Sequence, residues 1–288
     1  MVDKPSGWTS HDVVNKVRRI AATPRVGHLG TLDPMATGVL PLVVGRATRL
    51  AQFYTKNDKL YDAVIRFGHA TTTYDAEGAA TGEDVAYTIT LAELERLLAP
   101  FRGTIAQVPP PISAKKIGGQ PAYALVRKNI EVELKPVDVT IHSIEILECS
   151  GNTARIKVHC SSGTYLRRIA HDLGQAAGCG AYLDRLVRLK SGEFLLERSS
   201  TIERLMELAQ AERLEEALVP AADLLPEWPV EVVDAITAGH IRNGRDFRVS
   251  PFRVAKGSKY VKAVTEDGYL LAIGELKLPS LYHPMMVL

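Results

Sequence analysis

Helix-like and strand-like segments alternate along the first 228 residues, and this alternation limits the chain to a mixed α/β fold. Apolar residues recur at helical spacing over Ser10–Ile20, with the serine as a candidate helix cap. Thr90 and Glu93 form a capping-box signature before a second helical segment, and a third is predicted to open at Thr164 and end at Gly178. Strand-like runs lie between these helices, at residues 61–67, 137–148 and 154–160.

A proline-rich segment marks a predicted domain boundary. Residues 219–230 read VPAADLLPEWPV, with three prolines and a tryptophan after an acidic helical stretch. The tail beyond it is rich in β-branched and aromatic residues and has turn signals at Lys256-Gly257 and Asp267-Gly268. We therefore expect a large α/β domain over residues 1–228 and a small β-rich domain over residues 229–288.

Composition excludes several classes of protein. The chain of 288 residues is 46% hydrophobic and 24% charged, which is typical of a globular protein and not of a coiled coil or a disordered chain. Its densest apolar run, Gly38–Gly45, is far shorter than a membrane span and contains a proline. The first residues show no signal-peptide pattern, so we expect a cytoplasmic protein with no membrane partner. Three widely spaced cysteines fit neither a disulfide framework nor a zinc site, and we expect small buried side chains at Cys149, Cys160 and Cys179.

Charge is unevenly distributed although the net charge is only +2. Basic residues predominate in segments 1–60, 102–128, 155–190 and 242–262, whereas segment 201–230 is acidic. Separate basic blocks that converge on one face would give a polyanion several phosphate contacts. They are equally consistent with unrelated solvated surfaces, and charge alone leaves both alternatives open.

Familiar cofactor and metal motifs are absent from the sequence. There is no GxxxxGK[ST] phosphate loop, no GxGxxG, no GxSxG and no HExxH. None of the eight histidines pairs with another histidine or with a cysteine at metal-ligand spacing. We therefore expect no cofactor and no metal.

One acidic residue stands out in a segment rich in glycine and proline. Within Val26–Leu50, Asp33 lies between a leucine and Pro34, and Gly27 and Gly30 allow a tight loop just before it. Such a loop suits a positioned nucleophile. It also suits an aspartate that caps its own turn, and the spacing does not decide between the two.

The segment GHLGTLDPMATGVLPLVVGRATRL, residues 27–50, resembles the signature of the bacterial TruB-type tRNA pseudouridine synthases. Five further segments resemble the same family in the same order, so chance is a poor explanation; they span residues 3–14, 59–78, 107–127, 160–174 and 180–194. Small departures are Tyr74, where the family more often has a smaller residue, and Asp184, in a stretch commonly free of acids. The tail resembles a PUA domain less specifically.

The resemblance implies a fold and a reaction. The fold is a pseudouridine synthase catalytic domain with a mixed, largely antiparallel central sheet, flanking helices and a thumb-like insertion at about 107–130, followed by a PUA-like RNA-binding domain. The reaction isomerises a uridine in the T-loop of tRNA to pseudouridine, without a cofactor, by moving ribose C1′ from base N1 to C5. Whether the carboxylate attacks C6, attacks C1′ or removes a ribose proton stays open.

The resemblance also assigns roles to individual residues. Asp33 matches the catalytic aspartate, Arg167 the arginine that pairs with it, and Tyr61 the tyrosine that stacks on the target base. His28 matches the histidine that fills the stack after the uridine flips out, and two further positions line the uridine pocket, Tyr165 and Leu186. Taken singly, these side chains fit ordinary roles in packing, in hydrogen bonding or on a solvated helix face.

Several basic and aromatic residues are candidate RNA contacts. The thumb-like loop would close over the RNA, and phosphates would meet side chains on several basic blocks. The candidates are Lys4, Arg46, Arg49, Lys115, Lys116, Tyr123, Arg127 and the cluster at 242–262.

Three hypotheses follow for function. The first is a monomeric, stand-alone synthase that binds the T-arm of tRNA without a guide RNA. The second is a tRNA-binding folding chaperone in which isomerisation is secondary or lost; a chaperone would have no chemical need for Asp33, Arg167 and Tyr61 together. The third is a guide-dependent relative within a ribonucleoprotein, which predicts terminal extensions for partner proteins.

Replacing Lys115 and Lys116 with alanine tests the thumb-like loop. We expect weaker tRNA binding and a flatter dependence of affinity on salt, because fewer counterions are released when fewer phosphates are neutralised. Filter binding over a range of KCl concentrations measures both quantities. An unchanged salt slope would remove this loop from the RNA footprint.

Overall fold

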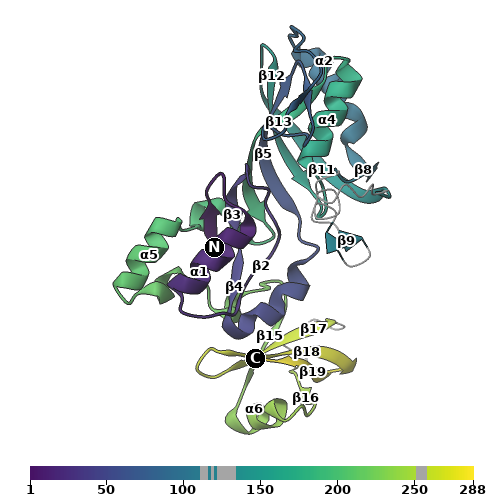
Figure 1. Cartoon of the computed structure of the whole chain (residues 1–288). Coiled ribbons are helices and arrows are strands. Elements are labelled where there is room, and N and C mark those ends of the chain that lie inside the picture. The colour runs from purple at the N-terminus through teal and green to yellow at the C-terminus, as the bar shows by residue number, and fades with distance from the viewer. Residues whose placement is uncertain (111–115, 118–119, 122–133, 251–257) are drawn as a thin grey trace.

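The computed structural model describes residues 1–110, 134–250 and 258–288 in full, and the backbone alone at 116–117 and 120–121 (Figure 1). Its larger part is built on a mixed sheet that runs through the centre of Figure 1, with helices beside it. A smaller β-rich part lies at the bottom of that view and holds the C-terminus.

The main sheet has eight strands among the described residues. In sheet order they are β1 (Val2–Lys4), β3 (Thr37–Leu40), β13 (Ala181–Ser191), β5 (Lys59–Phe67), β12 (Thr153–Cys160), β11 (Val137–Ser150) and β8 (Gly103–Gln107), with β14 (Phe194–Leu195) paired to the end of β13. The pair β3–β13 is parallel and the other neighbours are antiparallel. This confirms the expected mixed, largely antiparallel sheet.

Short two-stranded sheets lie outside the main sheet. They pair β2 (Val26–His28) with β4 (Leu42–Val44), β6 (Ala70–Thr71) with β7 (Ala80–Thr81), and β9 (Lys116–Ile117) with β10 (Gln120–Pro121). The first of these matters for function, because the chain leaves β2 directly into the loop that carries Asp33.

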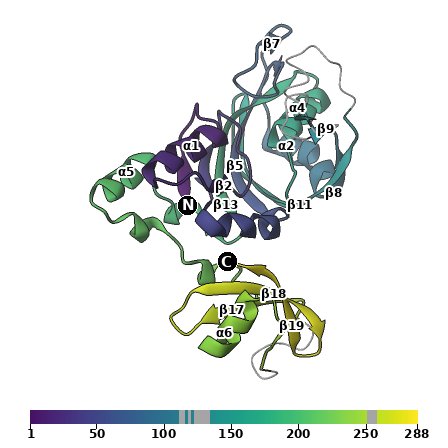
Figure 2. The same cartoon turned by 60° about the horizontal axis from the view of Figure 1, so that its bottom comes forward.

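The helices form two groups around the sheet. Figures 1 and 2 show α2 and α4 together at one end, and α1 and α5 together at the other. Their bounds are α1 Ser10–Ile20, α2 Leu91–Leu98, α4 Leu166–Ala177 and α5 Ile202–Gln210. Short 3-10 segments connect the elements: η1 (Gly45–Tyr54), η2 (Ala99–Phe101), η3 (Leu196–Arg198), η4 (Leu214–Ala217) and η5 (Ala221–Asp223).

The helix ends differ from expectation by one or two residues. The cap of α1 is Thr9 and not Ser10: Thr9 and Asp12 form a reciprocal capping box, which frees the serine for another contact. Thr90 caps α2 as predicted. Helix α4 begins at Leu166 and not at Thr164, although it ends as expected at Gly178 in a left-handed conformation.

Two hydrophobic clusters hold these layers together. One lies between the sheet and the helices α2 and α4, with buried side chains such as Ile65, Ile156, Leu98 and Leu173. The other packs the valines of α1 against the first strands and α5. In both clusters the buried residues alternate along the strands and lie on one face of each helix. This explains why apolar residues recur at helical spacing in the helices and at every second position in the strands.

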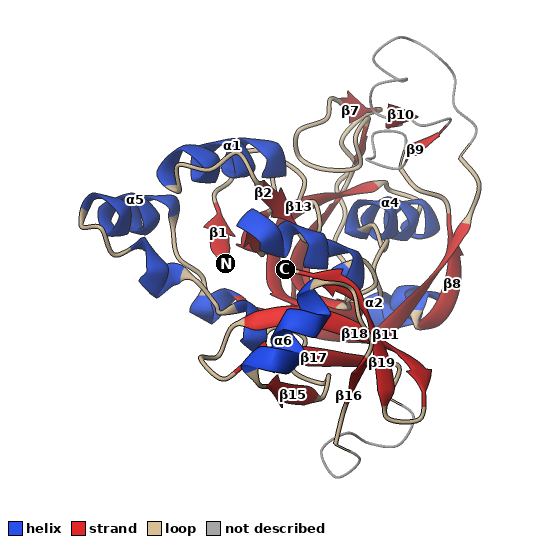
Figure 3. Cartoon of the chain, turned by 90° about the horizontal axis from the view of Figure 1, so that it is seen from below, coloured by secondary structure: helices blue, strands red, loops and turns tan. Residues whose placement is uncertain are grey.

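Among its described residues, the C-terminal part has a five-stranded sheet and one helix. Figure 3 shows this part from below. Its strand order is β15 (Val230–Val233), β17 (Tyr260–Thr265), β18 (Leu270–Leu278), β19 (Leu281–Val287) and β16 (Phe247–Arg248). The predicted turn at Asp267-Gly268 joins β17 to β18, whereas Lys256-Gly257 lies outside the described residues. Helix α6 (Ala235–Arg242) was not expected in this β-rich tail.

The two parts share a hydrophobic cluster. Leu50 and Phe194 of the larger part join Leu270, Ile273 and Met286 of the smaller part in it. A division into domains at residues 228 and 229 stays a prediction, consistent with the start of β15 at Val230.

Two further expectations concern membrane-spanning helices and the burial of the cysteines. Within the described ranges, no helix combines the length and the apolar character that crossing a membrane requires. All three cysteines are free thiols; Cys160 and Cys179 are buried, whereas Cys149 is half-buried.

Gly38 is required where β3 lies against the backbone of Arg188 in β13. Its φ is +101°, and a Cβ atom there would lie 2.3 Å from the carbonyl oxygen of Arg188. We expect Gly38→Ala to lower the free energy of unfolding by about 3 kcal/mol or more, whereas Gly45→Ala costs about 1 kcal/mol. Gly45 is the matched control, since its φ is +64° but no atom lies within 4 Å of the added carbon.

Urea unfolding of both variants and the wild type measures these values. Equal losses in the two glycine variants would contradict a role for the close approach.

Candidate active site

The loop after β2 holds Asp33 in a fixed turn. The backbone N–H of Ala36 donates to the Asp33 carbonyl at 3.1 Å. Leu32 is buried in the main core, and its N–H donates to Ser10 Oγ at 2.8 Å, while the Ser10 hydroxyl donates back to the Leu32 carbonyl. The first residue of α1 therefore fixes the loop through both backbone polar groups of Leu32.

Arg167 forms a bidentate ion pair with Asp33. Its Nε donates to Asp33 Oδ2 at 2.8 Å and its Nη2 donates to Oδ1 at 3.0 Å. The Arg167 side chain is only 5% exposed, whereas that of Asp33 is 33% exposed. The planar guanidinium thus orients both carboxylate oxygens and leaves part of the carboxylate open to a ligand.

A second carboxylate holds Arg167 from its other side. Asp75 Oδ2 lies 3.5 Å from Arg167 Nη1, which also donates to the Thr73 carbonyl at 3.1 Å. Asp75 is itself buried, and its Oδ1 accepts from the Thr73 hydroxyl and the Glu77 N–H. A buried guanidinium is stable only when paired, so this set of contacts fixes the position of Arg167 before any substrate binds.

Lys4 has a structural role and not the predicted phosphate contact. It is fully buried, and its ammonium donates to the carbonyls of Pro5, Trp8 and Pro34 at 2.6–3.0 Å. Burial lowers the pKa of Lys4 to about 8, and the negative charge of Asp33 opposes that shift. Its three N–H donors are used inside the protein, next to the loop that carries Asp33, so none is available to RNA.

Arg188 ties the same loop to the sheet. This side chain is fully buried on β13 and donates to the carbonyls of Gly30, Thr31 and Val39 at 2.8–3.2 Å. Burial lowers its pKa from the ordinary value. One guanidinium therefore donates to three backbone oxygens, two of them in the loop that leads to Asp33.

A cavity of about 550 Å³ opens beside the carboxylate. Asp33 and Arg167 line it together with three of the predicted pocket residues, Tyr61, Tyr165 and Leu186. These five residues come from the loop after β2, from β5, from the start of α4 and from β13. The structure thus brings together side chains that are distant in sequence around one space, which is large enough for a nucleotide base and its sugar.

In the cavity wall, Tyr61 is buried and the backbone of Tyr165 is held by a neighbouring side chain. Tyr61 is 7% exposed, and burial raises the pKa of its phenol, so the neutral form predominates near pH 7. Buried Gln107 accepts from the Tyr165 N–H at 2.8 Å and donates to the Tyr165 carbonyl at 3.2 Å. The start of α4, which has no side-chain cap of its own, is thereby fixed.

The remaining predicted residues lie outside this cavity. His28 is half-buried on β2, where its Nδ1 accepts from the Gly30 N–H at 3.4 Å and burial lowers its pKa. Arg46 and Arg49 are exposed on η1, and Arg49 also donates to the carbonyl of Val287. Lys115, Tyr123 and Arg127 lie outside the described residues, and Lys116 belongs to β9.

Only part of the basic cluster at 242–262 is on the surface. Arg242, Arg245 and Arg248 are exposed, as is Lys259. Lys262 is 3% exposed and donates to the carbonyls of the preceding linker, so it is not a candidate for phosphate contact.

The two departures from the family pattern have local partners. Tyr74, at φ +67°, stacks on His171 of α4 with ring centroids 3.9 Å apart. Because His171 lies one turn after Arg167, this stack packs the Asp75 loop against the helix that carries the arginine. Asp184 pairs with Arg66 at 3.3 Å, in a partly exposed contact between β13 and β5.

Sequence reasoning missed three residues of the site: Asp75, Arg188 and Lys59. All three lie within segments that resemble the family, but nothing in their spacing singles them out. Asp75 reaches Arg167 only because its loop bridges to Leu183 of β13. Lys59 and Arg188 line the cavity because they point to the same face of the sheet as Tyr61.

Comparison with known protein families identifies the chain. Residues 18–166 match the family model described as TruB family pseudouridylate synthase (N terminal domain), and residues 167–226 match the tRNA pseudouridylate synthase B C-terminal domain. The chain belongs to the TruB pseudouridine synthase family. It is therefore an isomerase, as the sequence predicted.

Two curated relatives of this TruB family member are similar over 90% or more of their length. The protein named tRNA pseudouridine synthase B from Solibacter usitatus (strain Ellin6076) is 59% identical over 288 residues, covering 100% of this chain and 98% of that protein. The protein of the same name from Pseudomonas putida (strain GB-1) is 43% identical, covering 96% and 90%.

Solved structures support the fold. A Cbf5-Nop10-Gar1 complex contains a chain that is 24% identical, with a TM-score of 0.73 over 100% of this chain and 82% of that one. An H/ACA RNP bound to a substrate RNA containing 2′-deoxyuridine gives a TM-score of 0.72 at 22% identity. These similarities confirm the expected fold class for the TruB chain.

Replacing Arg188 with methionine tests its role in positioning the loop that carries Asp33. Three backbone carbonyls lose their Arg188 donors, so we expect the free energy of unfolding to fall by about 3 kcal/mol or more and pseudouridine formation to slow at least tenfold. The matched control is Arg155→Met, because Arg155 is 41% exposed and pairs with Asp62 outside the cavity. We expect that control to cost about 1 kcal/mol.

Urea unfolding and initial rates of pseudouridine formation measure both effects. A variant at Arg188 with normal stability and normal rate would contradict this assignment.

Proposed function

We propose that this enzyme isomerises a uridine in the T-loop of tRNA to pseudouridine, with Asp33 as the catalytic carboxylate. The observation that carries the proposal is the bidentate pair of Asp33 with the buried Arg167 at the edge of the cavity. The names of the curated relatives support tRNA as the substrate. The T-loop site comes from the resemblance of the sequence segments to the family.

The target uridine must leave its stack to reach the cavity. Flipping a nucleotide costs a few kcal/mol, which contacts in the bound state have to offset. Tyr61, Tyr165 and Leu186 offer an aromatic and apolar wall for the flipped base. His28 lies outside that wall, in the position from which we propose that it fills the vacated stack, and burial favours its neutral, uncharged ring.

Asp33 supplies the reacting oxygen. The isomerisation breaks the bond between C1′ and N1 and forms the bond between C1′ and C5; a proton leaves C5 and another is taken up by N1, so no oxidant or reductant is needed. Attack at C6, attack at C1′ and removal of a ribose proton all require an ionised carboxylate. Arg167 fixes the direction of both carboxylate oxygens, so the geometry serves each of the three routes.

Tyr61 is better suited to stacking than to proton abstraction. A phenol with a raised pKa is protonated at neutral pH and acts as a hydrogen-bond donor. Its ring lines the cavity beside Asp33. We therefore propose that it orients the base and that any role in moving the C5 proton is a relay through its hydroxyl.

The surface cations supply the phosphate contacts. Arg46 and Arg49 on η1 are exposed beside the C-terminal strand, and Arg242, Arg245 and Arg248 are exposed on the small β-rich part. Together they would let one chain bind the T-arm directly. We propose a monomer that uses its own PUA-like C-terminal part in place of a guide RNA.

Asp33→Asn separates catalysis from binding. We expect no detectable pseudouridine and tRNA binding within a few fold of the wild type, because the amide keeps the size of the side chain but cannot act as the carboxylate does. Incubation with unmodified tRNA and chemical mapping of pseudouridine at each nucleotide gives the product and its position, and filter binding gives the affinity.

The matched control is Asp62→Asn. Asp62 also forms a bidentate pair with an arginine, Arg155, but on the other face of β5, so we expect nearly normal conversion. Normal turnover by Asp33→Asn would overturn the catalytic assignment. Conversion of a uridine elsewhere in tRNA would overturn the T-loop assignment, and binding without conversion by the wild type would favour the chaperone hypothesis.

A further inference from the structure

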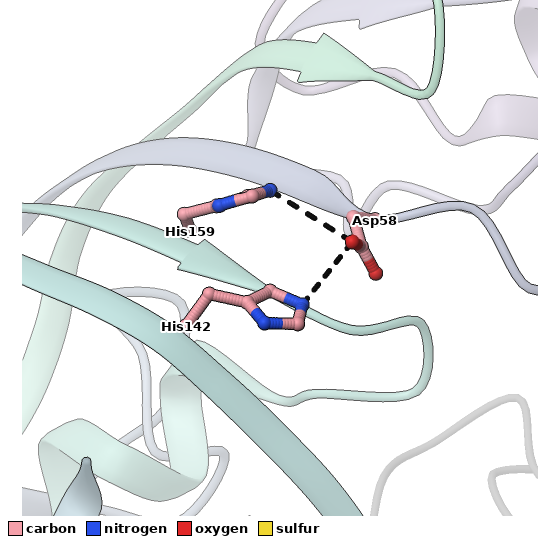
Figure 4. Close-up of side chains that lie close together, drawn as sticks. All are labelled: Asp58, His142 and His159. Atoms are coloured by element: carbon pink, nitrogen blue, oxygen red, sulfur yellow. Dashed lines mark ion pairs between the residues drawn. The ribbon is translucent and has the colours of Figure 1, made fainter. Parts of the chain in front are cut away.

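Three side chains with metal-binding groups meet on the face of the main sheet that is turned away from the cavity (Figure 4). Asp58 precedes β5, His142 lies on β11 and His159 lies on β12. In the register of β5 with β12, Cys160 pairs with Lys59 and His159 pairs with Leu60. Because side chains alternate between faces, His159 points away from the face on which Lys59 and Tyr61 line the cavity.

A β-bulge in β11 turns the side chain of His142 toward Asp58. The register between β11 and β12 shifts between Ile141 and Ser143, so His142 is the extra residue. A bulged residue is released from strict alternation and its side chain can be redirected. The imidazoles of His142 and His159 lie side by side, with ring centroids 4.7 Å apart, and both point toward Asp58.

The distances between the ligand atoms fit a small tetrahedral ion. His142 Nε2 lies 3.1 Å and His159 Nε2 lies 3.9 Å from Asp58 Oδ2, and all three ligand atoms lie within 4.8 Å of one another. Metal–ligand bonds of 2.0–2.1 Å place tetrahedral zinc ligands about 3.3–3.4 Å apart. The two separations from the carboxylate lie on either side of that value, and small side-chain rotations would bring the two imidazoles into range.

The chemistry of the donors selects the class of ion. Two imidazoles and one carboxylate suit Zn²⁺ and related transition metals, whereas Mg²⁺ and Ca²⁺ prefer oxygen ligands alone. In the described part of the chain, Asp58 forms salt bridges with these two histidines and with no lysine or arginine. The neighbouring Lys59 lines the cavity on the other face. The side chains are 37–46% exposed, which leaves room for a water ligand.

We propose that Asp58, His142 and His159 bind one divalent transition-metal ion of the zinc class, with water as a fourth ligand. The ion would join the beginning of β5 to β11 and β12. Since β5 carries Lys59 and Tyr61 of the cavity wall, a metal at this point would stiffen the strand on which the substrate base is placed. Nothing in this proposal depends on the identity of the RNA substrate.

Direct titration of the tag-free full-length protein with ZnCl₂ and with CoCl₂ tests the site. We expect about one equivalent of Zn²⁺ bound with micromolar or tighter affinity, and an intense visible spectrum of four-coordinate Co²⁺. A large excess of Mg²⁺ should not displace the ion. His142→Gln, His159→Gln and Asp58→Asn should each weaken binding at least tenfold, because each removes a ligand.

The chain offers a matched control. His283 contacts Asp246 at 2.7 Å on the surface of the C-terminal part, and within the part of the chain that the structure describes no second histidine joins that pair. We expect His283→Gln to bind Zn²⁺ as the wild type does. Circular dichroism of each variant shows whether it is folded, and Zn²⁺ should raise the Tm of the wild type and of the control only.

Three results would overturn the proposal. One is a wild-type affinity for Zn²⁺ weaker than millimolar. Another is equal binding by the wild type and the three ligand variants, which would leave the histidines as simple hydrogen-bond partners of Asp58. The third is a Co²⁺ spectrum with the strong near-ultraviolet bands of thiolate coordination, which would move the site to a cysteine.

Discussion

The ion pair between Asp33 and Arg167 is the contact on which the organisation of the site depends. It joins two segments that lie 134 residues apart, the loop after β2 and the first turn of α4. Arg167 is almost wholly buried, so its desolvation has to be offset by two carboxylates, Asp33 and Asp75. One of these carboxylates is itself enclosed, whereas the other keeps a third of its surface open. The protein thus holds a charge in place and leaves one edge of it available for chemistry.

Two buried cations, Lys4 and Arg188, stabilise the loop that carries Asp33. Lys4 and Arg188 donate six hydrogen bonds to backbone carbonyls, four of them within or beside residues 30–39. A loop has few strand partners of its own, so side chains must satisfy its carbonyl groups once it is buried. The same solution recurs where Lys262 of the C-terminal sheet donates to the linker before it. Basic residues in this protein are therefore found in the interior as well as on the surface.

The sequence predicted much of the fold and part of the site. Helices α2 and α4, the long strands and the turn at Asp267-Gly268 follow from periodicity, capping and turn chemistry. Helix α6 was missed, because its eight residues lie in a segment rich in β-forming residues. The resemblance to a family located Asp33, Arg167 and the cavity wall, but it treated Lys4 as a surface residue. Whether a single lysine is buried depends on the elements that pack over it, and the neighbouring residues in the sequence do not predict this.

What the sequence determined by itself was local: which segments form helices or strands, where they stop, and which loop is tight enough to hold an aspartate. These properties depend on interactions within a few residues, so they can be recognised along the chain. Only the tertiary structure decided which charged groups meet. The contact of Asp75 with Arg167, the three carbonyls on Arg188 and the convergence of His142 with His159 all depend on strand order and register. A shift of one residue turns a side chain to the opposite face of the sheet, so such meetings are set by pairing and packing across the whole molecule.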